Sequence, residues 1–225
     1  YGVVWSLNLL WRKLCGNDLH LLNIASANLD LLAVDLELTS LQVEDAEITS
    51  IGWVAGKANS VILDSSYYRL IKSDAQLGQS PIIHGLTPDL LNKGEGLNDV
   101  VEALRSAMLN HVLVFHNAML DLAVLNKIFV RYRLPKIEVV YFDTLKLALY
   151  LLEKRHTLVP QRGVSLSRCR ARAGLPKAPA HNALDDALAT LELCFAQQHE
   201  MGLTKEHAFN RLIHTHAIGW FTLGK

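Results

Sequence analysis

Two carboxylic acids follow a short apolar run near the beginning of the chain. Asp35 and Glu37 come directly after residues 31–34, and continuous apolar runs of this kind are typical of strands buried on both faces. Residues i and i+2 of a strand point to the same face, so the two carboxylates would repel each other unless a cation intervened. Asp45 and Glu47 repeat the spacing without such a strand before them. A solvated strand end is the structural alternative for either pair.

A third acid follows another apolar run. Asp121 comes after residues 112–115 and falls in the first turn of an expected helix, where the helix dipole stabilises a carboxylate. That is the structural explanation. The functional explanation is that open α/β sheets bind ligands beyond the carboxyl ends of their strands, where His116 and Asn117 would also lie.

The third cluster contains His181, Asp185 and Asp186, at the beginning of an expected helix over 182–198. One face of that helix has only small side chains, which allow close approach to another element. Asp186 lies at the edge of this face, so it would come near the other acids, whereas Asp185 would point to solvent or a neighbouring loop. Stabilisation of the helix N-terminus is the structural alternative for both acids.

Carboxylate oxygens at converging element ends suit Mg²⁺ or Mn²⁺ better than zinc. Two such ions a few ångströms apart stabilise the attacking and leaving oxygens of a phosphoryl displacement. A histidine on a nearby loop could deprotonate the attacking water near neutral pH.

The elements that must position these residues form an α/β pattern. A turn at Gly56–Asn59 joins two strand-like runs into a hairpin, and strands then alternate with helices, which predicts one mixed sheet with helices on its faces. The expected strands cover 31–34, 48–55, 61–70, 112–115 and 139–142, and the expected helices cover 100–108, 119–132, 145–152, 165–173 and 182–198. We expect a helical N-terminal extension (1–30), a catalytic domain (31–200) and a C-terminal extension (201–225) with weak helical periodicity.

Composition narrows the class of protein further. The 225 residues carry 22 basic and 22 acidic side chains, which excludes a strongly basic nucleic-acid coat and an acidic tail. Cys15, Cys169 and Cys194 have no metal-ligand spacing and suggest reduced thiols in a cytoplasmic protein. The apolar stretch over 3–14 is too short and too charged to span a membrane, and is interpreted as a docked or a membrane-surface helix. Because the chain opens at Tyr1, we expect the natural N-terminus to lie upstream.

Three motifs resemble those of the DEDDh, or DnaQ-like, 3′–5′ exonucleases of the ribonuclease H-like fold. The family's D-x-E-T-T-G-L is similar to residues 35–41, H-N-A-x-F-D to 116–121, and H-x-A-x-x-D to 181–186; weaker likeness occurs at 83–87 and 142–145. The resemblance implies a five-stranded mixed sheet, three antiparallel strands followed by two parallel ones, flanked by helices. It also implies release of nucleoside monophosphates from the 3′ ends of single-stranded DNA or RNA.

The resemblance assigns roles to particular residues. Asp35, Glu37, Asp121 and Asp186 would hold two Mg²⁺ or Mn²⁺ ions, and His181 would be the general base. The terminal nucleotide would contact Leu38 and Asn117; these substrate residues and the metal ligands are the expected site. Leu38 and Ser40 replace the family's usual threonine and glycine, which bears on substrate preference or rate.

Several alternatives stay open at this point. A haloacid-dehalogenase-type phosphatase also begins with acids after a strand, although it needs an aspartate where Glu37 stands, and a catalytically silent interaction module is a further alternative. The basic run that includes Arg162, Arg168, Arg170 and Arg172 could follow the substrate backbone or form a solvated helix face. The expected partners are nucleic-acid 3′ ends, with a homo-oligomer or a polymerase or repair protein left open.

Overall fold

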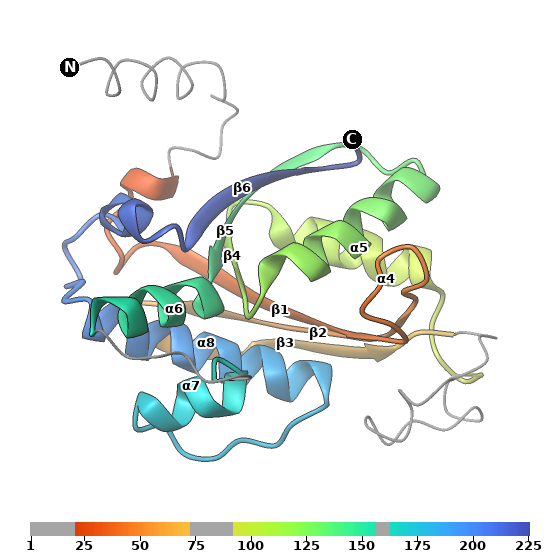
Figure 1. Ribbon diagram of the computed structural model, residues 1–225. Coiled ribbons are helices and arrows are strands. Elements are labelled where there is room, and N and C mark those ends of the chain that lie inside the picture. Colours follow the sequence, from red (N-terminus) through yellow and green to blue (C-terminus); the bar gives the residue numbers. More distant parts are fainter. Residues whose placement is uncertain (1–20, 73–91, 156–162) are drawn as a thin grey trace.

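A computed structural model of the protein describes residues 21–72, 92–155 and 163–225 (Figure 1). Most of the expected N-terminal extension (1–30), the segment 83–87 and Arg162 lie outside the described residues. Within the described part, no helix is long and apolar enough to cross a membrane.

A mixed sheet forms the centre of the fold. Its strands are β1 (Asp30–Leu38), β2 (Ile48–Lys57), β3 (Ser60–Leu70), β4 (Val112–Phe115), β5 (Ile137–Asp143) and β6 (Ile218–Leu223). The spatial order is β3-β2-β1-β4-β5-β6, with β1, β4 and β5 parallel and the other neighbours antiparallel. The carboxyl ends of β1, β4 and β5 therefore meet at one edge, as the sequence predicted for the acidic residues.

The predicted hairpin joins β2 and β3. Its two loop residues, Ala58 and Asn59, both have a positive φ (51° and 63°), and two consecutive positive φ values are what a tight two-residue hairpin turn needs to match the twist of its strands. The hairpin places β2 beside β1, which brings Gly52 opposite Asp35.

Helices cover both faces of the sheet. They are α4 (Leu97–Met108), α5 (Ala118–Arg131), α6 (Thr144–Lys154), α7 (Leu166–Arg172), α8 (Ala183–Glu200) and the short 3₁₀ helix η2 (Phe209–Thr215). α4 and α5 pack on one face, and α6 and α8 pack on the other, with α7 outside them (Figure 1). All five helices expected from the periodicity are present at close to their predicted bounds.

Alternation along β1 decides which face each acid occupies. Leu32, Val34 and Leu36 belong to the core beneath α4 and α5, whereas Leu31 and Ala33 belong to the core beneath α8. Because alternate residues of a strand share a face, Asp35 and Glu37 continue the second set and point toward α8.

The chain contributes one strand beyond the predicted five. β6 pairs antiparallel with β5 along Ile137–Phe142 and comes from the segment over 201–225, for which the sequence predicted weak helical periodicity. The preceding η2 is a single short 3₁₀ helix, and both elements are too short for a periodicity of either kind to stand out. The mixed α/β class is otherwise as expected.

Candidate metal centre

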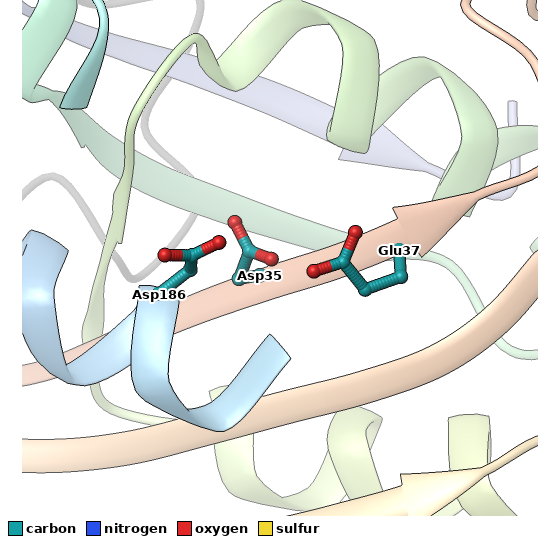
Figure 2. Close-up of side chains that lie close together, drawn as sticks. All are labelled: Asp35, Glu37 and Asp186. Carbon is teal, nitrogen blue, oxygen red and sulfur yellow. The ribbon is translucent and has the colours of Figure 1, made fainter. Parts of the chain in front are cut away.

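Three of the four predicted acids meet between β1 and the first turn of α8. Ligand oxygens of Asp35, Glu37 and Asp186 lie within 4.8 Å of one another, and Figure 2 shows the three carboxylates in a row with Asp35 in the middle. Among the described residues this cluster has the composition and spacing to hold a metal ion. Oxygen-only ligation of this kind suits a hard divalent cation.

Asp121 approaches the same place from the opposite layer of the fold. It is 9% exposed, lies in the first turn of α5, and does not belong to the group of three. Its charge nevertheless raises the pKa of Asp35, and the charge of Glu37 raises the pKa of Asp121. The fourth predicted ligand is therefore an electrostatic neighbour of the cluster.

The electrostatics of the cluster favour a cation. Burial, and then the carboxylates of Asp121, Asp186 and Glu37, raise the pKa of Asp35 well above its ordinary value. Burial and the Asp186 carboxylate raise the pKa of Glu37 to about 7, and burial raises that of Asp121 to about 8. Buried carboxylates that raise the pKa of their neighbours in this way need either protons or metal ions at neutral pH, so the donor set fits the divalent cations that the sequence implied.

His181 lies immediately beside this cluster. It is exposed, adopts a left-handed backbone (φ 68°), and its backbone N–H donates to Asp186 Oδ2 at 3.0 Å. The side chain of Asn182 begins α8 by accepting from Leu184 N and Asp185 N at 3.0 and 3.3 Å. These bonds fix the turn that carries both His181 and Asp186.

Close packing of α8 on the sheet depends on Gly52. A Cβ at Gly52 would lie 2.3 Å from the carbonyl carbon of Ala183 and 2.3 Å from Leu184 N. The backbone of the first turn of α8 thus rests directly on β2, opposite Asp35. The sequence predicted the small-residue face of α8 but missed its counterpart on the strand, for which an isolated glycine inside a strand run was the available signal.

Asp143 joins the two helices that follow β4 and β5. Its carboxylate accepts from Leu145 N and Lys146 N at 3.0 and 3.3 Å and so caps the beginning of α6. It also accepts from Asn117 N and Ala118 N, each at 3.1 Å, at the beginning of α5. One buried carboxylate therefore sets the position of the helix that carries Asp121.

The two predicted substrate contacts lie near the acids, and their role stays a prediction. Leu38 is partly buried and packs against the core, beside a bulge in the pairing of β1 with β2. Asn117 is exposed in the left-handed region (φ 82°) and makes no side-chain cap to α5. Ser40 Oγ accepts from Gln42 N at 3.0 Å.

His116 has a structural place in the fold. Its Nε2 lies 2.9 Å from the carbonyl oxygen of Val164 and its Nδ1 lies 2.8 Å from the hydroxyl of Thr144. Burial lowers its pKa, which favours a neutral ring that donates from Nε2 to Val164. His116 thus ties the end of β4 to α6 and to the segment before α7.

The basic run divides between two environments. Arg168 and Arg172 are exposed, but Arg170 is only 4% exposed. The guanidinium of Arg170 donates to Ala189 O at 2.8 Å and to Pro176 O at 3.0 Å, and it forms an ion pair of 2.8 Å with Glu192. Arg170 therefore belongs neither to a solvated helix face nor to a surface that follows the substrate backbone, because its guanidinium is bonded within the protein. These bonds hold the segment before His181 against α8.

Comparison with known proteins agrees with the motifs. Residues 32–194 match the family described as Exonuclease (RNase_T). The chain is 29% identical over 187 residues to the PolC-type DNA polymerase III of Thermotoga petrophila, covering 79% of this chain and 13% of that protein. It is 29% identical over 167 residues to the 3′-5′ exonuclease DinG of Staphylococcus saprophyticus, covering 71% of this chain and 17% of that protein. The chain thus spans less than a fifth of either relative.

Solved structures share the fold. Exonuclease I of E. coli in complex with an oligonucleotide superposes with a TM-score of 0.64 at 17% identity, over 83% of this chain and 43% of that one. Exonuclease X in complex with 5′-overhanging duplex DNA superposes with a TM-score of 0.59 at 21% identity, over 80% of this chain and 98% of that one. The family match spans most of the chain and contains all three motifs: the chain belongs to the DEDDh exonuclease family.

Proposed function

We propose that this chain is a metal-dependent exonuclease that removes nucleoside monophosphates from the 3′ end of single-stranded DNA or RNA. The observation that carries the proposal is the group of three carboxylates from β1 and α8 within 4.8 Å, inside a chain of the exonuclease family. The direction of attack is supported by the similarity to DinG, whose name states 3′-5′ exonuclease activity. A single-stranded substrate is supported by the fold shared with Exonuclease I, which is seen with an oligonucleotide.

The proposed roles follow from position. Asp35, Glu37 and Asp186, with Asp121 beside them, would hold two Mg²⁺ or Mn²⁺ ions. Bound there, these ions would supply positive charge to the attacking and leaving oxygens of the phosphodiester. His181 would accept the proton of the attacking water, since it lies beside Asp186 and is exposed to solvent.

The other functions considered from the sequence receive unequal support. The family match and the shared fold give no support to a haloacid-dehalogenase-type phosphatase. A silent interaction module would retain the fold without the chemistry, but the four acids and His181 are all present. The similarity to PolC supports a polymerase context as a proposal, whereas the homo-oligomer and the cytoplasmic location stay predictions.

Loss of one central ligand should remove the activity. We expect Asp35→Ala to lower Mg²⁺-dependent release of nucleotides by roughly 10³-fold or more, because it removes the carboxylate that lies between Glu37 and Asp186. The measurement is product length and rate on 5′-labelled single-stranded DNA and RNA with Mg²⁺ or Mn²⁺. The matched control is Asp30→Ala on the same strand, which should retain full activity. Retention of most activity in Asp35→Ala, or hydrolysis of none of these substrates by the natural chain, would reject the proposal.

The histidine should act on turnover alone. We expect His181→Ala to lower kcat by roughly 10²- to 10⁴-fold while Mn²⁺ affinity, measured by calorimetry, stays within about twofold. The expected split follows from the position of His181 outside the group of three carboxylates. A large loss of metal affinity would instead make His181 a ligand.

A further inference from the structure

The segment over 173–182 joins α7 to α8 and brings His181 to the metal centre. In Figure 1 it runs as a long loop from the end of α7 to the beginning of α8. Near its end, the backbone N–H of His181 donates to Asp186 Oδ2 at 3.0 Å. The position of His181 therefore depends on how the rest of this segment is held.

A cavity of about 490 Å³ lies between the segment and the two helices that it joins. Its lining includes Pro176, Pro179 and His181 on the segment, and Arg170 and Asp186 on the helices. Because the cavity occupies the space under the segment, fewer side-chain contacts support it than would support a loop packed on a core. Hydrogen bonds and the stiffness of its own backbone must hold it instead.

Arg170 supplies those hydrogen bonds from α7. Its Nη2 donates to Pro176 O at 3.0 Å, and its Nη1 donates to Ala189 O at 2.8 Å and lies 2.8 Å from Glu192 Oε2. Its backbone carbonyl accepts from Leu175 N at 3.0 Å. A planar guanidinium presents its donors in fixed directions, whereas the ammonium of a lysine is a compact charge on a flexible stem. One buried side chain thus joins the beginning of the segment to both helices.

The backbone between this bonded point and His181 is stiff. Pro176 accepts the Arg170 bond, and Pro179 lies two residues before His181. A proline fixes its own φ and restricts the residue before it to extended backbone. A displacement at Pro176 is therefore passed on to His181 rather than absorbed between them.

The charge of Arg170 also acts on the metal centre. Burial raises the pKa of Asp186, the backbone N–H of His181 lowers it, and the Arg170 guanidinium lowers it further. Removal of this positive charge would also remove a repulsion between Arg170 and a bound divalent cation. The charge alone therefore gives no reason to expect weaker metal binding when Arg170 is replaced by an uncharged residue.

We propose that Arg170 is a positioning residue for the exonuclease reaction. Its bonds to Pro176 and Ala189 hold the segment over 173–182 where His181 can accept the proton of the attacking water. The inference rests on the proposed function and adds to it a residue outside the group of three carboxylates. It gives the buried arginine of the basic run a task other than binding the substrate backbone.

Substitution of Arg170 provides the test, with kcat and metal affinity measured separately. We expect Arg170→Leu to lower kcat on a 5′-labelled single-stranded oligonucleotide by about 10- to 100-fold, the cost of displacing a catalytic group by about 1 Å. Mn²⁺ affinity by calorimetry should stay within about twofold. Arg170→Lys should lose about as much turnover, because lysine keeps the charge without the fixed directions of its donors. Natural turnover in either folded variant, or a fall in Mn²⁺ affinity that matches the fall in kcat, would overturn the inference.

Combination with His181→Ala identifies the residue through which Arg170 acts. If that residue is His181, Arg170→Leu should lower the residual activity of His181→Ala by no more than about twofold, because the effects of residues that act as a unit do not add. Losses that multiply in the double variant would mean that Arg170 acts on the fold or on the metal ligands. The positioning role would then be rejected while the exonuclease proposal stands.

Two further variants separate positioning from damage to the fold. Pro179→Gly leaves the bonds of Arg170 in place and loosens only the segment, so it should lower kcat by about three- to tenfold, with no further loss in His181→Ala. Arg105→Leu removes an arginine of α4 that is paired with Glu102 at 2.7 Å, and it should leave kcat and Mn²⁺ affinity unchanged. Melting followed by circular dichroism shows which variants are folded.

The outcomes distinguish this inference from the proposed function. A natural kcat in Pro179→Gly would contradict the stiff connection between Arg170 and His181, even where Arg170→Leu fails to fold. An active natural chain that tolerates both changes rejects the positioning role alone. If the natural chain hydrolyses no oligonucleotide, the exonuclease function fails, and this inference falls with it.

Discussion

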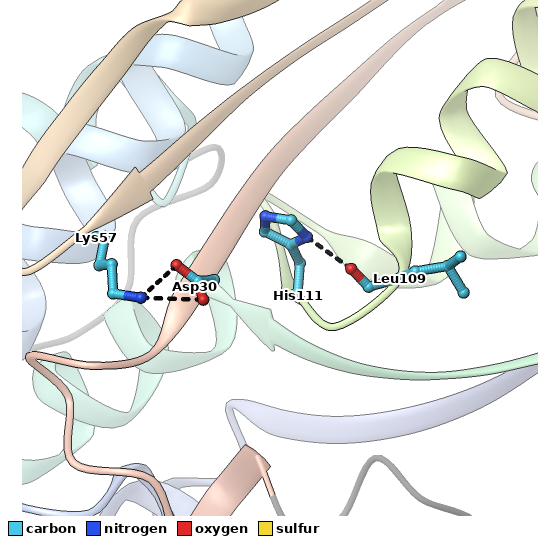
Figure 3. Close-up of polar contacts among 4 residues, drawn as sticks. All are labelled: Asp30, Lys57, Leu109 and His111. Carbon is cyan, nitrogen blue, oxygen red and sulfur yellow. Dashed lines mark hydrogen bonds and ion pairs between the residues drawn. The ribbon is translucent and has the colours of Figure 1, made fainter.

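The two ends of β1 carry acids in opposite electrostatic settings. At the amino end, Lys57 Nζ lies 2.8 Å from Asp30 Oδ1 and donates to Asp30 Oδ2 at 3.1 Å, which forms an ion pair between β1 and β2 (Figure 3). At the carboxyl end, Asp35 and Glu37 face Asp186. On the same strand, Asp30 is therefore paired with a lysine of the chain, whereas Asp35 and Glu37 lie beside further carboxylates.

The polar groups at the amino end are satisfied locally. Besides the Asp30 pair, His111 Nδ1 lies 2.9 Å from the carbonyl oxygen of Leu109 in the turn before β4 (Figure 3). Both members of the Asp30–Lys57 pair are more than 40% exposed, and ion pairs of that kind contribute about 0–1 kcal/mol to stability. The difference teaches that the acid at the amino end has its cation within the chain, whereas Asp35 and Glu37 lie among carboxylates whose charges raise the pKa of Asp35, a setting typical of functional sites.

Two glycines of β2 sharpen the comparison, because each supports α8 at one end of β1. Gly52 pairs with Asp35 and Gly56 pairs with Leu31. A Cβ at Gly52 would meet the α8 backbone at 2.3 Å, whereas at Gly56 its nearest contacts would be the side-chain ends of Leu191 and Phe195 at 2.9 Å. Flexible side-chain ends can move aside, but the first turn of the helix cannot do so without carrying Asp186 with it.

We therefore expect Gly52→Ala to lower nucleotide release by about 10- to 100-fold, the cost of a displacement of about 1 Å in catalytic groups. Gly56→Ala should change activity by no more than about threefold, even where it lowers the melting temperature. Rates on a labelled oligonucleotide and Mn²⁺ affinity by calorimetry measure both variants. If Gly52→Ala retains natural activity and metal affinity, the contact of α8 with β2 does not set the metal centre.

Much of this arrangement could be predicted because its signals are local. The apolar run before Asp35 marks a buried strand, and Asp143 at a strand–helix junction predicts a cap. Other features depend on contacts between distant segments. Arg170 sits in a basic run that is typical of a solvated face, and only the carbonyls of Ala189 and Pro176 explain its burial. The need for a glycine at position 52 likewise becomes apparent only when the backbone of α8 is seen to pack against it.

The hydrogen bonds between Asp143 and the beginning of α5 were also not predicted, because they too join distant segments. The carboxylate reaches Asn117 N and Ala118 N because β4 and β5 are parallel neighbours, so the residues that follow them come together. The sixth strand was missed because Ile218–Leu223 is short and its pairing partner, β5, is distant in sequence. Tertiary pairing, which no local pattern specifies, decided both features.

The smallest expected effect is on stability, and it has the opposite sign from that of an ordinary ion pair. Without metal, the pKa values of Glu37 and Asp121 rise to about 7 and about 8 in the folded protein, above the unfolded values of about 4. The folded state then binds more protons than the unfolded state. The contribution of these two groups to the free energy of unfolding is therefore fully present below about pH 4 and is lost as the pH rises through about 7 to 8. Urea unfolding in EDTA between pH 5.5 and 8.5, conditions chosen to cover roughly that window, should show this decline.

Two variants assign the decline to one end of β1. Asp35→Asn removes a carboxylate whose repulsion contributes to the effect, so it should flatten the fall in stability with pH and raise stability at pH 8. Asp30→Asn should keep the natural slope and lower stability by no more than about 1 kcal/mol, because it removes only an exposed ion pair. Saturating Mn²⁺ should restore stability at pH 8 in the natural chain and in Asp30→Asn, but far less in Asp35→Asn, because ligand binding stabilises only the state that holds it. A stability independent of pH in EDTA would mean that solvent, rather than a missing cation, balances the carboxylates at the end of β1.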